Sequence, residues 1–389
     1  MQESFRWFGP ADPVPLSFIR QAGATAVFTS LHDIPYGEAW PREAIRERKA
    51  LIEAAGLRWN VVESVPVHEN IKTGQGDLQR LFANYLTSLR HLADEGIRTV
   101  IYNFMPVLDW VRTDMRWPMP DGSLSMRFDP VRFAAFEIHA LQRQDAAADY
   151  TPEQAAQAAA WWRGLDDAAR YAFVRSIIDV FPGVKWNLTL DDVRAMLAGY
   201  AGIGETQLQS NLERFLGAII PEAEKLATRM AIHPDDPPFS VLGLPRIVST
   251  AAHLDAILAM ADSPANGICF CTGSLGSRPD NDLPAMVRRF APRIHAAHLR
   301  STQLDADGSF HEAAHLGGSV DMPAVAAALL DEQTRRGLHD PIPFRPDHGQ
   351  VMMDDLAKPD GITPGYSAIG RMKGLAELRG LMLGLLRNT

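Results

Sequence analysis

The sequence predicts an α/β protein folded as a (β/α)8 barrel. Short apolar segments alternate with amphipathic helical segments along the chain of 389 residues, and eight segments of the strand type can be distinguished. Residues that bind metals or move protons follow several of these strands, and in such barrels the functional groups stand at the carboxyl ends of the strands. We therefore expect residues 1–389 to form one barrel domain.

The composition indicates a globular protein that acts on a small molecule. An apolar fraction of 46% is enough for a large core, and a net charge of -9 argues against a nucleic-acid partner, which requires clustered basic residues. The first residues lack a signal-peptide pattern, and no apolar run approaches the roughly 20 residues of a membrane span. We expect a cytoplasmic protein without a membrane partner. The only cysteines, Cys269 and Cys271, cannot form a disulfide framework.

Four β/α units are predicted in the first part of the chain. Glycines that end helices mark the boundaries, as Gly23, Gly56 and Gly96 do. The predicted strands span residues 5–10, 25–31, 57–63 and 99–104, and the predicted helices span residues 15–23, 40–55 and 78–95.

A long insertion follows the fourth strand. Residues 108–205 begin with a loop rich in Trp, Pro and Met and continue with Ala-rich helical segments, including 150–162 and 166–181. We assign no chemistry to this mostly helical insertion and consider an oligomer contact as its role. The alternation then resumes, with helices at 207–228, 251–260, 283–290, 323–336 and 366–386 and strands at 229–233, 267–271, 293–300 and 342–345.

Four consecutive predicted strands end in residue types that bind metals. These are His233, Cys271, His298 and Asp347. Singly, each has an ordinary explanation, because a strand-end His is commonly hydrogen-bonded and a lone Cys is commonly buried. Together they would surround one divalent ion and leave positions open for substrate oxygens. Cys269 faces the same way as Cys271 but lies one layer deeper, so we expect it to pack in the barrel.

Other polar residues near strand ends suit a polyhydroxylated acid. Asn103 offers both a donor and an acceptor to hydroxyl groups, and His68 follows the third strand at a greater distance. Arg278 is available for an anionic group, and Arg300 stands just beyond the seventh strand. Ordinary loop packing or solvation is the alternative explanation for this set.

A competing motif, His311-Glu312-Ala313-Ala314-His315, matches the zinc-peptidase pattern. That chemistry needs a stable helix to place both histidines on one face. The segment is short, lies between two glycine-containing turns and follows a barrel strand, so we discount a peptidase. We expect this loop to lie over the mouth of the site.

Seven stretches of the sequence occur in the order and spacing typical of the mannonate dehydratase family, which the chain resembles over nearly its whole length: Trp7-Phe8-Gly9-Pro10, Asn103-Phe104-Met105-Pro106, His233-Pro234-Asp235-Asp236, Cys271-Thr272-Gly273-Ser274, His298-Leu299-Arg300, Arg345-Pro346-Asp347-His348-Gly349 and Pro364-Gly365-Tyr366-Ser367. The resemblance implies a barrel like that of xylose-isomerase-like enzymes. It also implies dehydration of D-mannonate to 2-keto-3-deoxy-D-gluconate in hexuronate breakdown, with Mn2+ or Fe2+. Separately, we expect a homo-oligomer.

Carried over by position, the resemblance makes the four strand-end residues metal ligands and makes His348 an acid/base residue assisted by Tyr366. The predicted substrate-binding residues are those chosen from their places near strand ends, Asn103, Arg278, Arg300 and His68. Two alternatives remain open. One is a metal-dependent sugar isomerase, which would need bridging carboxylates on several strands, and the other is a sugar-acid sensor without turnover.

Overall fold

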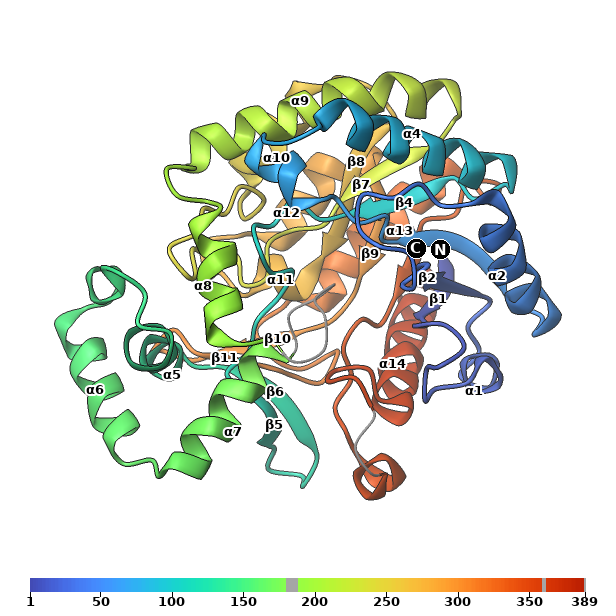
Figure 1. Ribbon diagram of the computed structural model, residues 1–389. Helices are drawn as coiled ribbons and strands as arrows, with labels where there is room; N and C mark the ends of the chain where they lie inside the picture. The colour runs from blue at the N-terminus through green and yellow to red at the C-terminus, as the bar shows by residue number, and fades with distance from the viewer. Residues whose placement is uncertain (180–187, 359–361, 388–389) are drawn as a thin grey trace.

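A computed structural model describes residues 1–179, 188–358 and 362–387. Within these residues, eight parallel strands close into a barrel and confirm the predicted fold class (Figure 1). Each barrel strand pairs with the barrel strands that precede and follow it in the chain, and the last pairs with the first. The strands are β1(Gln2–Arg6), β2(Ala26–Thr29), β3(Arg58–Glu63), β4(Thr99–Tyr102), β7(Arg229–Ile232), β8(Asn266–Cys271), β9(Ile294–His298) and β12(Pro343–Arg345).

The first strand lies earlier in the chain than predicted. β1 ends at Arg6, whereas the apolar pattern placed a strand at residues 5–10. Beyond it, the Asp12 carboxylate accepts hydrogen bonds from the amides of Phe8 and Val14, and the chain turns at Gly9 with a φ of 101°. Because the Asp12 carboxylate binds these amides, Phe8 to Pro10 form a turn instead of continuing the strand.

An outer ring of helices covers the barrel strands. Helix α4 (Leu78–Asp94) shows why these segments are helical. Asp77 caps its first turn, and Leu81, Leu89 and Leu92 recur on its buried face. The eight predicted helices that accompany barrel strands are all present: α1(Leu16–Gln21), α2(Arg42–Ala54), α4(Leu78–Asp94), α9(Glu205–Lys225), α10(Ala251–Met260), α12(Leu283–Phe290), α13(Met322–Arg336) and α14(Ala368–Leu386).

The barrel interior contains one apolar layer of side chains, contributed by six strands. Its members are Phe28, Val61, Ile101, Ala231, Cys269 and Ala296. Cys269 is fully buried there, as predicted from its distance to Cys271. Because side chains alternate along a strand, the positions two residues further on point the same way and reach the mouth of the barrel.

A second, four-stranded sheet lies beside the barrel and was not predicted. It is antiparallel, in the order β10-β11-β6-β5, with strands β5(Asp114–Pro118), β6(Leu124–Phe128), β10(Thr302–Leu304) and β11(Phe310–Glu312) (Figure 1). The first part of the insertion is thus a hairpin, not a Trp/Pro/Met-rich loop. Its central strand pairing, between β6 and β11, joins segments that are far apart in the chain, so no local pattern predicts it.

Helices make up the rest of the insertion and extend away from the barrel (Figure 1). They pack in a second apolar cluster, which includes Phe133, Phe136 and Ile177 and is shared with Phe128 and Phe310 of the second sheet. Both predicted helical segments are present, although the predicted end at Phe181 lies outside the described residues. The elements are α5(Pro130–Ala135), η1(Phe136–Ala140), η2(Ala146–Asp149), α6(Pro152–Arg163), α7(Asp167–Ile178) and α8(Leu190–Ala198).

The remaining short elements connect strands to helices. They are α3(Glu69–Thr73), α11(Thr272–Gly276), η3(Ala291–Arg293) and η4(Met353–Ala357). Among the described helices, none is both long and apolar enough to cross a membrane.

Candidate metal and active site

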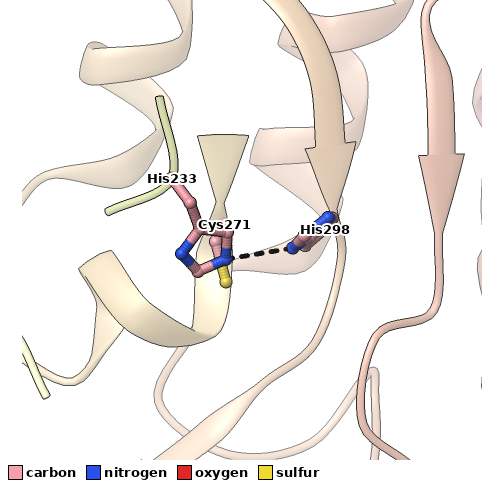
Figure 2. Close-up of side chains that lie close together, drawn as sticks. All are labelled: His233, Cys271 and His298. Carbon is pink, nitrogen blue, oxygen red and sulfur yellow. Dashed lines mark hydrogen bonds between the residues drawn. The ribbon is translucent and has the colours of Figure 1, made fainter. Parts of the chain in front are cut away.

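Three of the four predicted ligands meet at the carboxyl ends of adjacent strands. His233 follows β7, Cys271 ends β8 and His298 ends β9, and Figure 2 shows their side chains converging. One donor atom from each residue lies within 4.8 Å of the others. The Nε2 atom of His233 and the Nδ1 atom of His298 are 3.1 Å apart.

The chemistry of these donors fits a divalent transition-metal ion. Two imidazole nitrogens and one thiolate are ligands that Fe2+ and Zn2+ accept, and Cys271 and His298 are fully buried. The Nδ1 atom of His233 lies 2.7 Å from the carbonyl oxygen of Pro234, which fixes the ring and leaves Nε2 for a ligand.

The protonation of the two imidazoles differs. Burial holds the pKa of His298 well below its ordinary value, and the nearby Arg345 charge lowers it further, so this ring is neutral. Burial would also lower the pKa of His233, but the hydrogen bond and charge of Cys271, with the charges of Asp347 and Glu63, together outweigh burial and raise that pKa to about 9. A cation at this position would replace the proton on His233.

Two hydrogen-bond donors of Ser274 contact the Cys271 sulfur. The backbone amide of Ser274 donates to it at 3.4 Å and the Ser274 hydroxyl at 3.2 Å, both from the first turn of α11. These hydrogen bonds fix the position of the sulfur, which ligates metals as the thiolate.

Asp347, the fourth predicted ligand, borders this group but does not belong to its closest cluster. Its Oδ2 atom is 3.6 Å from the Cys271 sulfur. Arg300 donates to the same oxygen at 2.6 Å, and Arg345 donates to Oδ1. Arg345 and Arg300, together with the neighbouring His348, hold the pKa of Asp347 well below its ordinary value despite burial. The residue has a φ of 39°, which an Asp adopts more readily than most residues.

A cavity of about 600 Å³ opens next to the cluster, with His233 and Asp347 in its wall. The predicted residues Asn103, Arg300, His348 and Tyr366 also line it.

His348 and Tyr366 lie together, with ring centroids 5.2 Å apart and ring planes at 82°. The amide of Gly349 donates to the carbonyl oxygen of Gly365 at 2.7 Å, which joins the two ends of the loop that separates the rings. Residues 359–361 of that loop lie outside the described residues. Burial raises the pKa of Tyr366 to about 12.

His68 and Arg278, two predicted substrate-binding residues, have other partners. The Nδ1 atom of His68 accepts from the amide of Asn70 and caps α3. Arg278 forms two hydrogen bonds with Asp280 and one with the carbonyl oxygen of Pro238. Neither residue is among the described residues that line the cavity.

Glu312 is a site residue that sequence reasoning missed. It belongs to β11, where its carboxylate contacts Arg112, Arg300 and the Nδ1 atom of His348. The zinc-peptidase motif is therefore a strand followed by a loop instead of a helix. It lies against His348, and its second histidine, His315, bonds the carbonyl oxygen of Pro346.

Glu63 and Arg6 also line the cavity and received no role from the sequence. Glu63 binds Arg345 through both carboxylate oxygens and lies 3.6 Å from the Nε2 atom of His298. Each stands two residues beyond an inward-facing position, Val61 or Ser4, and each ends its strand. Because every second side chain of a strand faces the barrel interior, the position two residues beyond an interior residue predicts each of them.

Comparisons with known proteins agree over the whole chain. A family model described as D-mannonate dehydratase (UxuA) matches residues 1–389. A mannonate dehydratase of Chromohalobacter salexigens is 52% identical over 384 residues, covering 98% of each chain, and one of Marinomonas sp. is 51% identical over 389 residues, covering 99% of each.

Solved structures of other proteins also resemble the structure of this chain. The mannonate dehydratase of Streptococcus suis serotype 2 has 36% identity and a TM-score of 0.76, covering 100% of this chain and 94% of that one. The D-psicose 3-epimerase of Clostridium cellulolyticum H10, at 9% identity and a TM-score of 0.53, shares the fold, covering 99% of each chain. On the full-length family match and the identity to its relatives, this chain belongs to the D-mannonate dehydratase family.

Proposed function

We propose that this protein dehydrates D-mannonate to 2-keto-3-deoxy-D-gluconate and water, in the breakdown of hexuronates. The observation that carries the proposal is the convergence of His233, Cys271 and His298 beside a cavity that also holds His348 and Tyr366. Family membership supplies the substrate.

His233, Cys271, His298 and Asp347 are the residues that would hold a divalent cation, Mn2+ or Fe2+. When bound, such a cation supplies a Lewis acid that stabilises negative charge on substrate oxygens. Arg300 and Arg345 keep Asp347 ionised, and Glu63 lies on the far side of His298 from His233. These contacts fix the donor atoms before substrate arrives.

Dehydration requires removal of the proton at C2 and protonation of the C3 hydroxyl as it leaves. His348 accepts the C2 proton, and Tyr366 donates to the hydroxyl. Tyr366 suits donation because a pKa of about 12 keeps its hydroxyl protonated at neutral pH. The enol that results becomes the 2-keto acid.

Substrate hydroxyls would be bound in the cavity by Asn103, whose amide both donates and accepts, and the carboxylate side would face Arg300. We leave His68 and Arg278 outside the substrate site because neither lines the cavity formed by the described part of the chain. A cytoplasmic location and a homo-oligomeric assembly stay predictions.

The test is an assay for a 2-keto-3-deoxy acid after incubation with D-mannonate. Product should form with Mn2+ or Fe2+, disappear after chelation and return when the metal is restored. Product from metal-free protein would overturn the metal assignment. Product from a different aldonate, but none from D-mannonate, would overturn the substrate, and turnover of an aldose to a ketose would identify an isomerase.

A further inference from the structure

The side chain of Glu312 approaches the active site from behind His348, and its backbone is fixed by the second sheet. Glu312 pairs with Thr302 of β10, and its carbonyl oxygen accepts a hydrogen bond from the Ser125 hydroxyl at 2.5 Å. Only 3% of the residue is exposed, and among the described residues it is not part of the cavity wall. Its contact with the reaction would therefore have to pass through another side chain.

Three donors converge on one oxygen of this carboxylate. Arg112 donates to Oε1 at 2.8 Å, Arg300 donates to the same atom, and the Nδ1 atom of His348 lies 3.1 Å away. Oε2 is buried and has no hydrogen-bond partner within the described part of the chain. Burial would raise the pKa of Glu312, but the charges of Arg300 and Arg112 and the hydrogen bond from His348 hold it well below its ordinary value.

The contact fixes which nitrogen of His348 carries the proton. An ionised carboxylate only accepts hydrogen bonds, so Nδ1 must donate, and in the neutral ring Nε2 is left with a free lone pair. The ring itself is confined, because Tyr366 packs edge-on against it and a Cβ atom on Gly365 would lie 2.9 Å from its Cδ2 atom. With the ring confined, the partner of Nδ1 decides which tautomer is present.

We infer that Glu312 is a positioning residue for the dehydration, holding His348 as the Nδ1–H tautomer so that Nε2 faces the cavity as proton acceptor. This inference rests on the proposed function for its catalytic consequence, whereas the tautomer can be observed independently. The acceptor comes from the second sheet, and the histidine follows a barrel strand.

Neutralising the buried arginines does not by itself explain the position of Glu312. Asp236 binds the same two guanidinium groups, with Oδ1 2.6 Å from Arg112 and Oδ2 in contact with Arg300. Glu312 differs from Asp236 in that it also contacts His348. His315, three residues later, holds the carbonyl oxygen of Pro346, so the same segment supports both sides of the Asp347-His348 pair.

The kinetic test compares Glu312→Ala with Arg112→Met. Both variants break the buried ion pair between these residues, but only the first removes the acceptor from His348. Glu312→Ala should retain bound metal and keep KM within about threefold, while kcat falls on the order of 10²–10⁴-fold, the usual range for general acid–base catalysis. Arg112→Met should keep kcat within about tenfold, because the carboxylate still contacts His348. Equal kcat losses in both, or loss of metal in step with kcat in Glu312→Ala, would overturn the inference.

A second measurement needs no variant of Glu312 and no turnover. Nitrogen-15 NMR of histidine-labelled wild-type protein, loaded with diamagnetic Zn2+, reports the tautomer of each imidazole. The signals of His348 are identified by their loss in His348→Asn. A protonated Nδ1 and an unprotonated Nε2 are expected, and the opposite tautomer would overturn the inference whether or not the protein dehydrates D-mannonate.

Discussion

The barrel and the four-stranded sheet beside it are built from contacts of different range along the chain. Neighbouring barrel strands follow one another in order, except where β12 closes the barrel on β1, whereas the second sheet bonds Arg127 to Ser309 across 182 residues. The barrel brings the candidate metal ligands together at its strand ends, and the second sheet supplies the carboxylate behind His348. The comparison teaches that the site combines a part set by local sequence and a part set by long-range pairing.

The largest effect should come from the barrel side, in Cys271→Ser compared with Cys269→Ser. We expect Cys271→Ser to lose bound metal and to lose activity by on the order of 10³-fold or more, because a Lewis acid contributes several kcal/mol. Cys269→Ser should keep its metal and lose only about 1–3 kcal/mol of stability through a buried hydroxyl. Elemental analysis compares the metal content of the two variants, and the product assay compares their activity. Equal metal content in the two variants would remove Cys271 from the ligand set.

The adjacent pair Asp347 and His348 should separate metal binding from proton transfer. Asp347→Asn is expected to weaken metal affinity by at least about tenfold, as loss of a charged group at a metal site does. His348→Asn should retain the metal and lose on the order of 10²–10⁴-fold in kcat. Chelator competition and steady-state kinetics distinguish the two, and a His348→Asn protein that has lost its metal would contradict the division of roles.

Arg112→Met tests how much stability the second sheet draws from its buried charges. Arg112 is fully buried between Asp236 and Glu312, so its loss should lower the free energy of unfolding by about 3–5 kcal/mol. Arg278→Met, which removes a partly exposed ion pair with Asp280, should cost no more than about 1 kcal/mol. Urea unfolding compares the two variants, and similar losses would mean that the buried network does not support the sheet.

Acid should weaken the barrel wall through Glu63. Burial opposes its ionisation, but the charges of Arg345 and Arg6 and the hydrogen bonds from Arg345 lower its pKa from 4.5 to about 2. Because the folded pKa is below the unfolded one, this stabilisation is present above pH 4.5 and is lost as the pH falls toward 2. The loss between pH 5 and pH 3 should be roughly 2 kcal/mol. Glu63→Gln, though less stable at neutral pH, should lose less stability over that interval. If its free energy of unfolding depends on pH as in the wild-type protein, Glu63 is not the group responsible.

Local sequence was sufficient for the barrel and for the donors at its rim. Apolar alternation and glycine stops located all eight strands within a few residues, and His233, Cys271 and His298 followed from strand ends alone. The second sheet was missed because β6 meets β11 only after the barrel closes. Its turns did leave a signal, since Asp121-Gly122 and Asp307-Gly308 are dipeptides typical of hairpins, with Gly122 and Gly308 at positive φ.

The role of Glu312 could not be read from its motif for the same reason. The spacing of His311 and His315 suggests a helix, but pairing with β6 and β10 makes a strand that turns Glu312 toward His348. Long-range pairing thus decided which side chain of the motif reached the site.

X-ray absorption spectroscopy of the metal-loaded protein tests the central claim most directly, because it detects the atoms bound to the metal without reference to activity. We expect one sulfur ligand together with nitrogen and oxygen ligands in the wild-type protein. The sulfur should be lost in Cys271→Ser but not in Cys269→Ser. A wild-type spectrum without sulfur, or with sulfur that persists in Cys271→Ser, would contradict a metal site built on the ends of β7, β8 and β9.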